Sequence, residues 1–398
     1  MPTPPVHGHA APGFEGVRAA FAENLALRGE LGGACALVRD GETLVDLWGG
    51  VRDSATASPW EQDTVVLTYS VTKGLAAAAL AWLHAQGRLD YDAPVADLWP
   101  EFAAAGKGAI TLRTLLAHQA GLSGVDTKLT PALVGDLDAL ATVLARQEPA
   151  WPPGTRHAYH ALSLGFFQNE IARRADERGR TIGTLVQEEF AAPLRQRLSV
   201  GVPPDLPASR IAPIEPVNPL KIFAHPGELS PRFALALICP WSLTAKSVRN
   251  PRLEGPADLD LPVWRGLELP SSNGYATARA VAALYGALAN DGGPLGIGAA
   301  TRALLAAPVQ LPEAGEYDRV FKRHTAYALG FMKPSSDFDF GTSPRAFGAP
   351  GVGGSFGYAD PDTRCGYAYV TNRLGFNVFD DPREQALRRA CEAALRNA

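Results

Sequence analysis

The sequence predicts an α+β fold, with a central antiparallel sheet built from both chain ends, flanked by helices and interrupted by an inserted, mainly helical region. Three observations predict it. Strand patterns occur near both termini, helical apolar spacing dominates between them, and an amphipathic helical pattern closes the chain. This order fits a sheet assembled from both ends. A chain of 398 residues is long enough for one large or two ordinary domains.

The elements of the first half follow from the spacing of apolar residues. Residues 13–30 have helical spacing. Residues 33–50 predict two strands joined by a turn at Asp40-Gly41. Further helices are expected over residues 70–87, which end near Gly87, over 110–122 with Thr111 as a cap, over 131–147 and over 161–176.

The second half begins with a change of pattern. Between about residues 200 and 262 proline recurs and periodicity is lost, over a length that predicts a functional cap or a pocket wall. A helix is expected in "NGYATARAVAALYGALANDGG", strands in "AYALGFMK", "GSFGYADP" and "CGYAYVTNR", and a last helix in "DPREQALRRACEAALRN". We therefore assign residues 1–66 and 265–398 to the sheet region and residues 67–264 to the helical region.

Composition and charge exclude several classes of protein. The net charge of −4 comes with no basic stripe, which argues against a nucleic-acid partner. No window is apolar enough to span a bilayer, so no membrane partner is expected. The N-terminus lacks the basic and apolar regions of a signal peptide. The cysteines are scattered and predict reduced thiols of a cytoplasmic protein; they are Cys35, Cys239, Cys365 and Cys391. Oligomeric state is left open.

A serine and a lysine stand three residues apart at the start of an apolar helix, in "YSVTKGLAAAAL". Positions i and i+3 share a helix face, so Ser70 and Lys73 are expected within reach of each other. A serine hydroxyl becomes a nucleophile when a base takes its proton, and a lysine with a lowered pKa can be that base. The alternative is a helix with an N-terminal serine and a solvated lysine. The almost wholly apolar helix after Lys73 favours the catalytic pair.

Several stretches, in order, resemble the serine β-lactamase and penicillin-binding-protein superfamily, and within it the family VIII carboxylesterases. "YSVTKG" is similar to the first motif of that superfamily. Segments similar to the following ones are "GRLDYDAPVADLWPEF", "ITLRTLLAHQAGL", "PPGTRHAYHALSLGF", "LPSSNGYATARAVAALYGAL" and "FGAPGVGGSFGYADP". The resemblance spans about residues 15–395. It implies a β-lactamase/transpeptidase-like fold that forms one continuous catalytic unit, with no cofactor.

The resemblance also implies roles for later residues. The second motif begins at Tyr159, whose hydroxyl would relay a proton to the leaving group. The third motif falls on residues 349–351, and the backbone N–H groups of Ser70 and Val352 would form the oxyanion hole. Gly351 and Gly353 would let substrate approach the backbone closely. Read without the resemblance, Tyr159 is a core tyrosine and the glycines form a turn.

The sequence departs from the superfamily pattern at two positions. Ala161 stands where asparagine or serine is usual, and Ala349 where lysine or histidine is usual. Alanine supplies neither the donor nor the charge that holds β-lactams or peptidoglycan peptides. Arg345 is a nearby candidate for the missing charge. The departures favour simple, uncharged esters as substrates.

Three other features need an interpretation. His160 follows Tyr159 and is expected to pack beside the site, and we count it with Gly351 and Gly353 as substrate-binding. His118 and His157 lack metal-ligand spacing, so no metal site is expected. Residues 353–357, "GGSFG", fit G-x-S-x-G, but a strand and not a helix is predicted to follow, and no histidine lies downstream. Ser355 is therefore not expected to be the nucleophile.

The sequence thus predicts a serine carboxylesterase acting on small, short-chain esters through an acyl-enzyme, with Ser70 as nucleophile and Lys73 and Tyr159 as general base and acid. The same site would also suit a β-lactamase, an amidase or D-aminopeptidase, or an acyltransferase. A binding protein that has lost catalysis is the remaining alternative. The altered positions 161 and 349 count against the β-lactamase and the D-aminopeptidase and leave the binding protein open.

Overall fold

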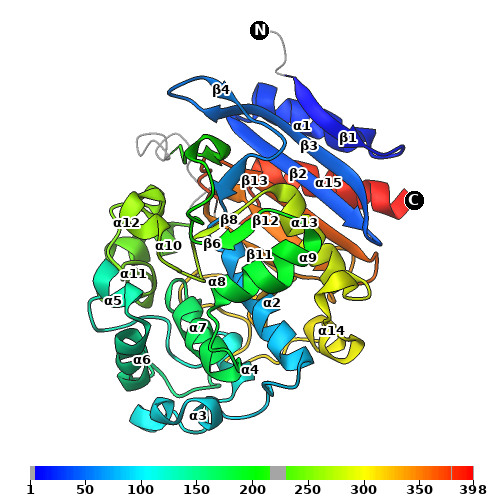
Figure 1. The fold of residues 1–398 in the computed structure, drawn as a ribbon. Coiled ribbons are helices and arrows are strands. Elements are labelled where there is room, and N and C mark those ends of the chain that lie inside the picture. Colours follow the sequence, from blue (N-terminus) through cyan, green and yellow to red (C-terminus); the bar gives the residue numbers. More distant parts are fainter. Residues whose placement is uncertain (1–4, 216–229, 378, 398) are drawn as a thin grey trace.

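The computed structural model describes residues 5–215, 230–377 and 379–397 (Figure 1). Its largest sheet is antiparallel and contains strands from both chain ends: β1 (Val6–Ala10), β2 (Gly32–Arg39), β3 (Glu42–Asp53), β4 (Ser58–Pro59), β9 (Ala326–Ala328), β10 (Phe331–Lys333), β11 (Phe347–Pro350), β12 (Phe356–Asp360) and β13 (Cys365–Thr371). The order is β1-β3-β2-β13-β12-β11-β10-β9, with β4 beside β3. The predicted fold is confirmed, because β2 of the N-terminal part pairs directly with β13 of the C-terminal part.

Helices cover both faces of this sheet (Figure 1). Helices α1 (Glu15–Leu27) and α15 (Pro382–Asn397) pack together on one face, and α13 (Ala278–Ala289) packs against β2, β12 and β13. Alternation along β2 matches these two layers: Ala34 and Ala36 belong to the core beneath α13, while Cys35 and Leu37 belong to the core shared with α1 and α15.

A second, four-stranded sheet leads into the functional region. It consists of β5 (Val65–Leu67), β6 (Leu198–Val200), β7 (Ile211–Ala212) and β8 (Gly274–Ala276), in the order β6-β8-β5-β7. Strands of two or three residues carry no readable period, which is why the sequence did not predict them. Helix α2 (Val71–Ala85) follows β5 after three residues and is almost wholly buried.

Several expected elements are confirmed and others are shorter than predicted. The turn between β2 and β3 has positive φ at both Asp40 and Gly41, as a two-residue hairpin requires. The helix expected over 110–122 ends at Leu116, although Thr111 caps it by accepting from the N–H of Thr114. The helix expected over 131–147 is interrupted at Asp136, whose side chain caps a new helix. Strand β1 was not predicted.

The middle of the chain is mainly helical, as expected. Its helices are α3 (Val95–Leu98), α4 (Leu112–Leu116), α5 (Pro131–Gly135), α6 (Leu137–Arg146), α7 (Ser163–Ala175), α8 (Ile182–Leu185), α9 (Ala192–Leu194), α10 (Pro231–Ile238), α11 (Leu243–Val248) and α12 (Pro262–Arg265), and α14 (Ala299–Ala306) follows α13. Part of the predicted cap, residues 216–229, lies outside the described residues. The division of the chain at residues 66 and 264 stays a prediction.

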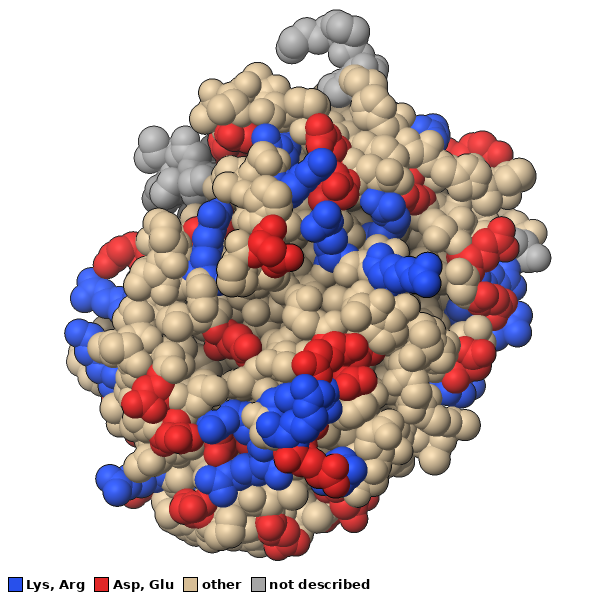
Figure 2. All heavy atoms as spheres, in the orientation of Figure 1, with Lys and Arg blue, Asp and Glu red and all other residues tan. Residues whose placement is uncertain are grey.

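The charged side chains on the face in Figure 2 are mixed in sign, with lysine and arginine interspersed among aspartate and glutamate. No continuous basic stripe crosses that face. Among the described residues, no helix is long and apolar enough to cross a bilayer.

Candidate active site

Ser70 lies at the start of α2, immediately after a strained residue. Tyr69 has a φ of +51°, a conformation that residues with a side chain adopt rarely, and it turns the chain from β5 into the helix. Ser70 is the N-cap residue, yet its side chain makes no capping hydrogen bond. Its hydroxyl is partly exposed, so it is available to a partner other than the helix.

Lys73 lies one turn further along α2, and its Nζ is 3.3 Å from Ser70 Oγ. The side chain is 2% exposed, and burial holds the pKa of its amine well below the ordinary value. Nζ donates to the carbonyl oxygens of Ala161, at 2.6 Å, and Ser271, at 2.9 Å. A neutral amine has two N–H groups and one lone pair. With both N–H groups on carbonyls, the lone pair is left for the serine hydroxyl.

Tyr159 lies beside Ser70 and Lys73, with which the sequence analysis grouped it. Lys73 Nζ lies 4.7 Å from the centre of its ring. Burial raises the pKa of the Tyr159 phenol, a hydrogen bond with Ser70 opposes that rise, and Asp318 adds to it. The phenol therefore keeps its proton near neutral pH, and Lys73 is the better placed base of the two.

The segment that carries Tyr159 is held by two residues that the sequence did not indicate. The carboxylate of Asp318 is fully buried and accepts from the backbone N–H of Tyr159 at 3.1 Å and from the hydroxyl of Tyr327 at 2.8 Å. Ser247, in α11, donates to the carbonyl of Tyr159 at 2.7 Å and accepts from the N–H of Ala161 at 2.9 Å. Because Ala161 also binds Lys73, Ser247 ties the tyrosine and the lysine to one framework.

Replacing Ser247 by alanine is expected to lower kcat about tenfold. The change leaves two buried backbone groups without their partner, which costs about 2 kcal/mol and frees residues 159–161 to shift. The matched control is Ser242→Ala, which removes the N-cap of the same helix without touching that segment. Steady-state kinetics with an ester substrate, beside thermal unfolding, checks this. Equal kcat values for the two variants would contradict it.

Backbone groups engage both ring nitrogens of His160. It is fully buried, its Nδ1 is 2.7 Å from the carbonyl of Ala158, and its Nε2 accepts from the N–H of Leu122. Burial lowers its pKa to about 3, and the pKa of His118 also falls well below the ordinary value. The expectation that His160 packs beside the site agrees with these contacts. The expectation that it binds substrate does not, since both ring nitrogens are occupied.

The third predicted segment lies beside the start of α2. A Cβ atom on Gly351 would stand 2.4 Å from the carbonyl oxygen of Thr68 and 3.4 Å from Val71, so only glycine permits this approach. Val352, the next residue, has a half-exposed side chain. Its backbone N–H is thereby brought to the same end of α2 as the N–H of Ser70. Two such donors suit an oxyanion.

Ala349 lies against α2 at Gly74, the residue after Lys73, since a Cβ on Gly74 would stand 3.4 Å from the Ala349 methyl group. The site therefore has no cation at this position. Arg345 does not replace it: its half-exposed side chain pairs with Asp362 at 2.7 Å, at the opposite end of β11 from Gly351. Arg345 and Gly351 are six positions apart, which in extended chain is a separation of about 20 Å.

Gly353 and Ser355 are both buried against the neighbouring C-terminal strand segment. Gly353 has a φ of +85° and lies in a 3-10 turn between β11 and β12, against Leu374. Ser355 is buried, and its Oγ accepts from the N–H of Thr371 at 3.3 Å. A strand, β12, follows it at once. The context that G-x-S-x-G needs in an α/β-hydrolase is therefore missing, as the sequence predicted.

Aromatic side chains continue from Tyr159 toward the cap. The ring of Phe321 lies 4.6 Å from that of Tyr159, and Phe233, in α10, lies 6.1 Å beyond it. Phe379 packs on Phe321 from the C-terminal side at 5.0 Å. Region 200–262 therefore contributes Phe233 to the aromatic cluster beside Tyr159, and Ser247 to the hydrogen bonds that hold Tyr159. No cluster of three or more metal-ligating side chains occurs among the described residues.

The chain is similar in sequence and in fold to several known proteins. The Beta-lactamase family model matches residues 17–392. The chain is 34% identical over 382 residues to the esterase/β-lactamase LipL of Mycobacterium tuberculosis (strain ATCC 25618 / H37Rv), over 93% of this chain and 83% of LipL. Esterase EstB of Burkholderia gladioli is 35% identical over 108 residues, 26% of this chain and 28% of EstB.

Solved structures include similar chains with several different names. A family VIII carboxylesterase has a TM-score of 0.84 and 36% identity, over 98% of this chain and 100% of that one. A penicillin-binding protein homologue from Caulobacter crescentus has a TM-score of 0.84 and 37% identity, with the same coverage. EstA from Arthrobacter nitroguajacolicus Rue61a has a TM-score of 0.83 and 30% identity, over 98% of each chain.

Proposed function

Because this chain belongs to the β-lactamase family, we propose that it is a serine carboxylesterase that hydrolyses small, uncharged esters through an acyl-enzyme on Ser70. The observation that carries the proposal is the environment of Lys73. Its buried amine donates to two carbonyls and has its lone pair left for Ser70 Oγ. A serine with such a base is an activated nucleophile.

In the first half-reaction, Ser70 Oγ attacks the ester carbonyl while its proton passes to Lys73 Nζ. The N–H groups of Ser70 and Val352 donate hydrogen bonds to the carbonyl oxygen as negative charge develops on it. Tyr159, which keeps its proton, gives it to the departing alkoxide and takes one from Lys73. Water then attacks the acyl-enzyme with the same groups in reversed roles, and the acid leaves.

The substrate class follows from what surrounds these groups. Ala161 and Ala349 supply no polar side chain, and Arg345 is paired elsewhere. Phe321 and Val352 are apolar and only partly buried. A short, uncharged acyl group fits this environment better than the carboxylate of a β-lactam, which would lose its ionic partner. The names of the relatives, which include both esterases and an esterase/β-lactamase, support testing both activities.

Hydrolysis of p-nitrophenyl acetate, butyrate and octanoate, with nitrocefin alongside, tests this function. We expect the two short esters to have the highest kcat/KM, and nitrocefin to be turned over at least about 100-fold less efficiently, as the loss of a charged contact predicts. Faster nitrocefin turnover would indicate a β-lactamase. Transfer to an added alcohol in preference to water would indicate an acyltransferase. No turnover and no acylation would favour a binding protein.

A cytoplasmic location stays a proposal. It is supported by the four cysteines, all of which are free thiols, three of them buried.

A further inference from the structure

The loop that carries Val352 needs an external support. Residues 351–354, which we call the glycine loop, contain three glycines, and Gly353 and Gly354 have φ values of +85° and +118°. Glycine gives a chain wide conformational freedom, so the loop cannot hold Val352 in place by its own stiffness. This inference rests on the proposed function, in which the N–H of Val352 donates to the oxyanion. Such a donor must be held in place before the reaction begins.

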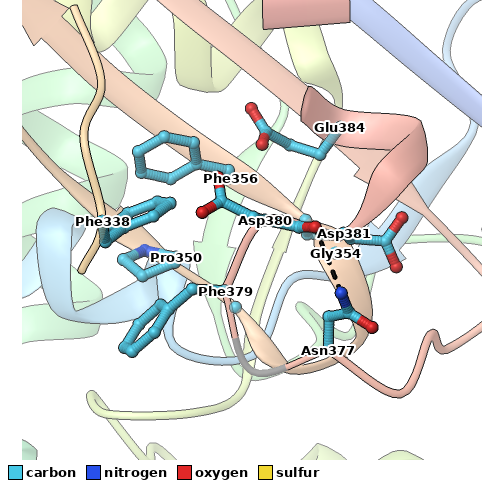
Figure 3. A pocket seen from close by; sticks show the side chains of 11 residues that line it. Phe338, Pro350, Gly354, Phe356, Asn377, Phe379, Asp380, Asp381 and Glu384 are labelled. Atoms are coloured by element: carbon cyan, nitrogen blue, oxygen red, sulfur yellow. Dashed lines mark hydrogen bonds between the residues drawn. The ribbon is translucent and has the colours of Figure 1, made fainter. Parts of the chain in front are cut away.

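Packing supports only part of this loop. Gly351 lies tightly against Thr68, and Gly353 lies against Leu374. The loop also borders a small hollow, which is lined by Phe338, Phe356 and Phe379 and by the acidic residues Asp380, Asp381 and Glu384 (Figure 3). The hollow has about 10 Å³ of space for a water molecule's centre, room for about one water. Hydrogen bonds must therefore supply what packing does not.

Arg383, at the start of α15, supplies one of them. Its Nη2 donates to the carbonyl of Gly353 at 2.8 Å, and the N–H of Gly375 donates to the same oxygen at 3.0 Å. The guanidinium is itself fixed, because Nε and Nη2 form a bidentate pair with Asp381 at 2.9 Å each. The Arg383 side chain is 5% exposed.

A second group of contacts fixes the far edge of the guanidinium. Its Nη1 donates to the carbonyl of Arg373 at 2.8 Å and pairs with the buried carboxylate of Glu30 at 3.3 Å. Glu30 also accepts from the hydroxyls of Tyr369 and Thr371, in β13. Every nitrogen of Arg383 is therefore engaged, and the glycine loop is tied through it to α15 and to the sheet.

We propose that Arg383 is a positioning residue for the oxyanion hole: by holding the carbonyl of Gly353, it restrains the glycine loop and, two peptide units away, the peptide that carries the N–H of Val352. Asp381 and Glu30 hold the guanidinium, and Arg383 acts through the glycine loop. Lysine cannot replace this arrangement, because a point charge does not reproduce the bidentate fork.

Arg383→Lys tests the inference, with Arg180→Lys as matched control. Arg180 is likewise a buried arginine, and it forms ion pairs with three carboxylates, those of Asp176, Glu188 and Glu189. It does not contact the glycine loop. Both variants keep a positive charge but lose the bidentate hydrogen bonds of a buried guanidinium. Rates are expressed per active site, by titrating Ser70 with a fluorophosphonate, so that partial unfolding lowers the number of sites and not the rate of each.

For Arg383→Lys we expect kcat for p-nitrophenyl butyrate to fall about 10- to 100-fold per site, with KM within about threefold, since an oxyanion donor acts mainly in the transition state. A boronic acid, which places an oxygen in the oxyanion hole, should bind more weakly by a similar factor. Arg180→Lys should keep the rate per site and the boronate affinity.

Equal rates per site in Arg383→Lys and the wild type would overturn the inference, as would a loss confined to KM. This failure differs from failure of the proposed function, in which the wild type itself would neither turn over esters nor react with the fluorophosphonate.

Discussion

Ser70→Ala should lower kcat/KM for p-nitrophenyl butyrate by at least about 10⁴-fold while leaving the fold intact. Removal of the nucleophile from a serine hydrolase typically costs about this much or more. The fold should survive because the Ser70 hydroxyl makes no capping bond and its contact with Lys73 is 3.3 Å long. Steady-state kinetics and thermal unfolding of the purified variant check both parts.

Ser355→Ala is the control for this experiment. Ser355 stands in the other nucleophile-like pattern, but its Oγ binds the N–H of Thr371 and a strand follows it. Most of the activity should remain, with a loss of less than about tenfold, as removal of one buried hydrogen bond predicts. If instead Ser70→Ala kept its activity and Ser355→Ala lost it, the assignment of the nucleophile would be wrong.

Lys73→Arg should lower kcat/KM by at least about 10³-fold. Arginine keeps a positive charge and several donors, but it does not lose its proton in proteins and therefore cannot act as a base. An effect this size is expected when an activated nucleophile loses its base. Lys73→Met, which is neutral and similar in length, should be equally inactive. Activity retained by the arginine variant would show that Lys73 acts only as a charge or a donor.

The pH dependence of the wild type follows from the same lysine. Burial holds the pKa of Lys73 well below its ordinary value, so a neutral amine is available at pH values where a surface lysine is charged. As the pH falls through that lowered pKa, the amine takes up a proton and kcat/KM should fall. A pH profile that shows no such decrease on the acidic side would contradict the role of Lys73.

Stability should change in the corresponding direction. The unfolded chain binds the proton that the folded amine gives up, so a fall in pH from the ordinary lysine pKa toward the lowered one destabilises the fold. Lys73→Met has no such proton. Its free energy of unfolding should therefore decline less than that of the wild type over this range, as denaturant titrations at several pH values would show.

The fold and the central pair could be predicted because their signals lie close together in the chain. The Asp40-Gly41 pair predicts the β2–β3 hairpin, and Ser70 and Lys73 are one helical turn apart. The supports of the site could not be predicted in this way. Ser247 is 88 residues from Tyr159, Asp318 is 159 residues from it, and Arg383 is 30 residues from Gly353. Only folding brings these residues together, and no spacing or motif marks them.

His160 shows the limit of inference from an adjacent position. It follows Tyr159 directly, so the sequence placed it near the substrate, but the fold turns its ring toward the backbone of Ala158 and Leu122.

Strand β1 was not predicted because three of its five residues are exposed, so its sequence shows no buried face.

The most direct test of the account is to identify the acyl-enzyme. Wild-type protein mixed with p-nitrophenyl butyrate and quenched within the first turnovers would be examined by intact mass and by peptide mapping. We predict one butyryl group on the peptide that contains Ser70, absent from Ser70→Ala. Ester hydrolysis without any adduct, or with the adduct on another residue, would contradict the account.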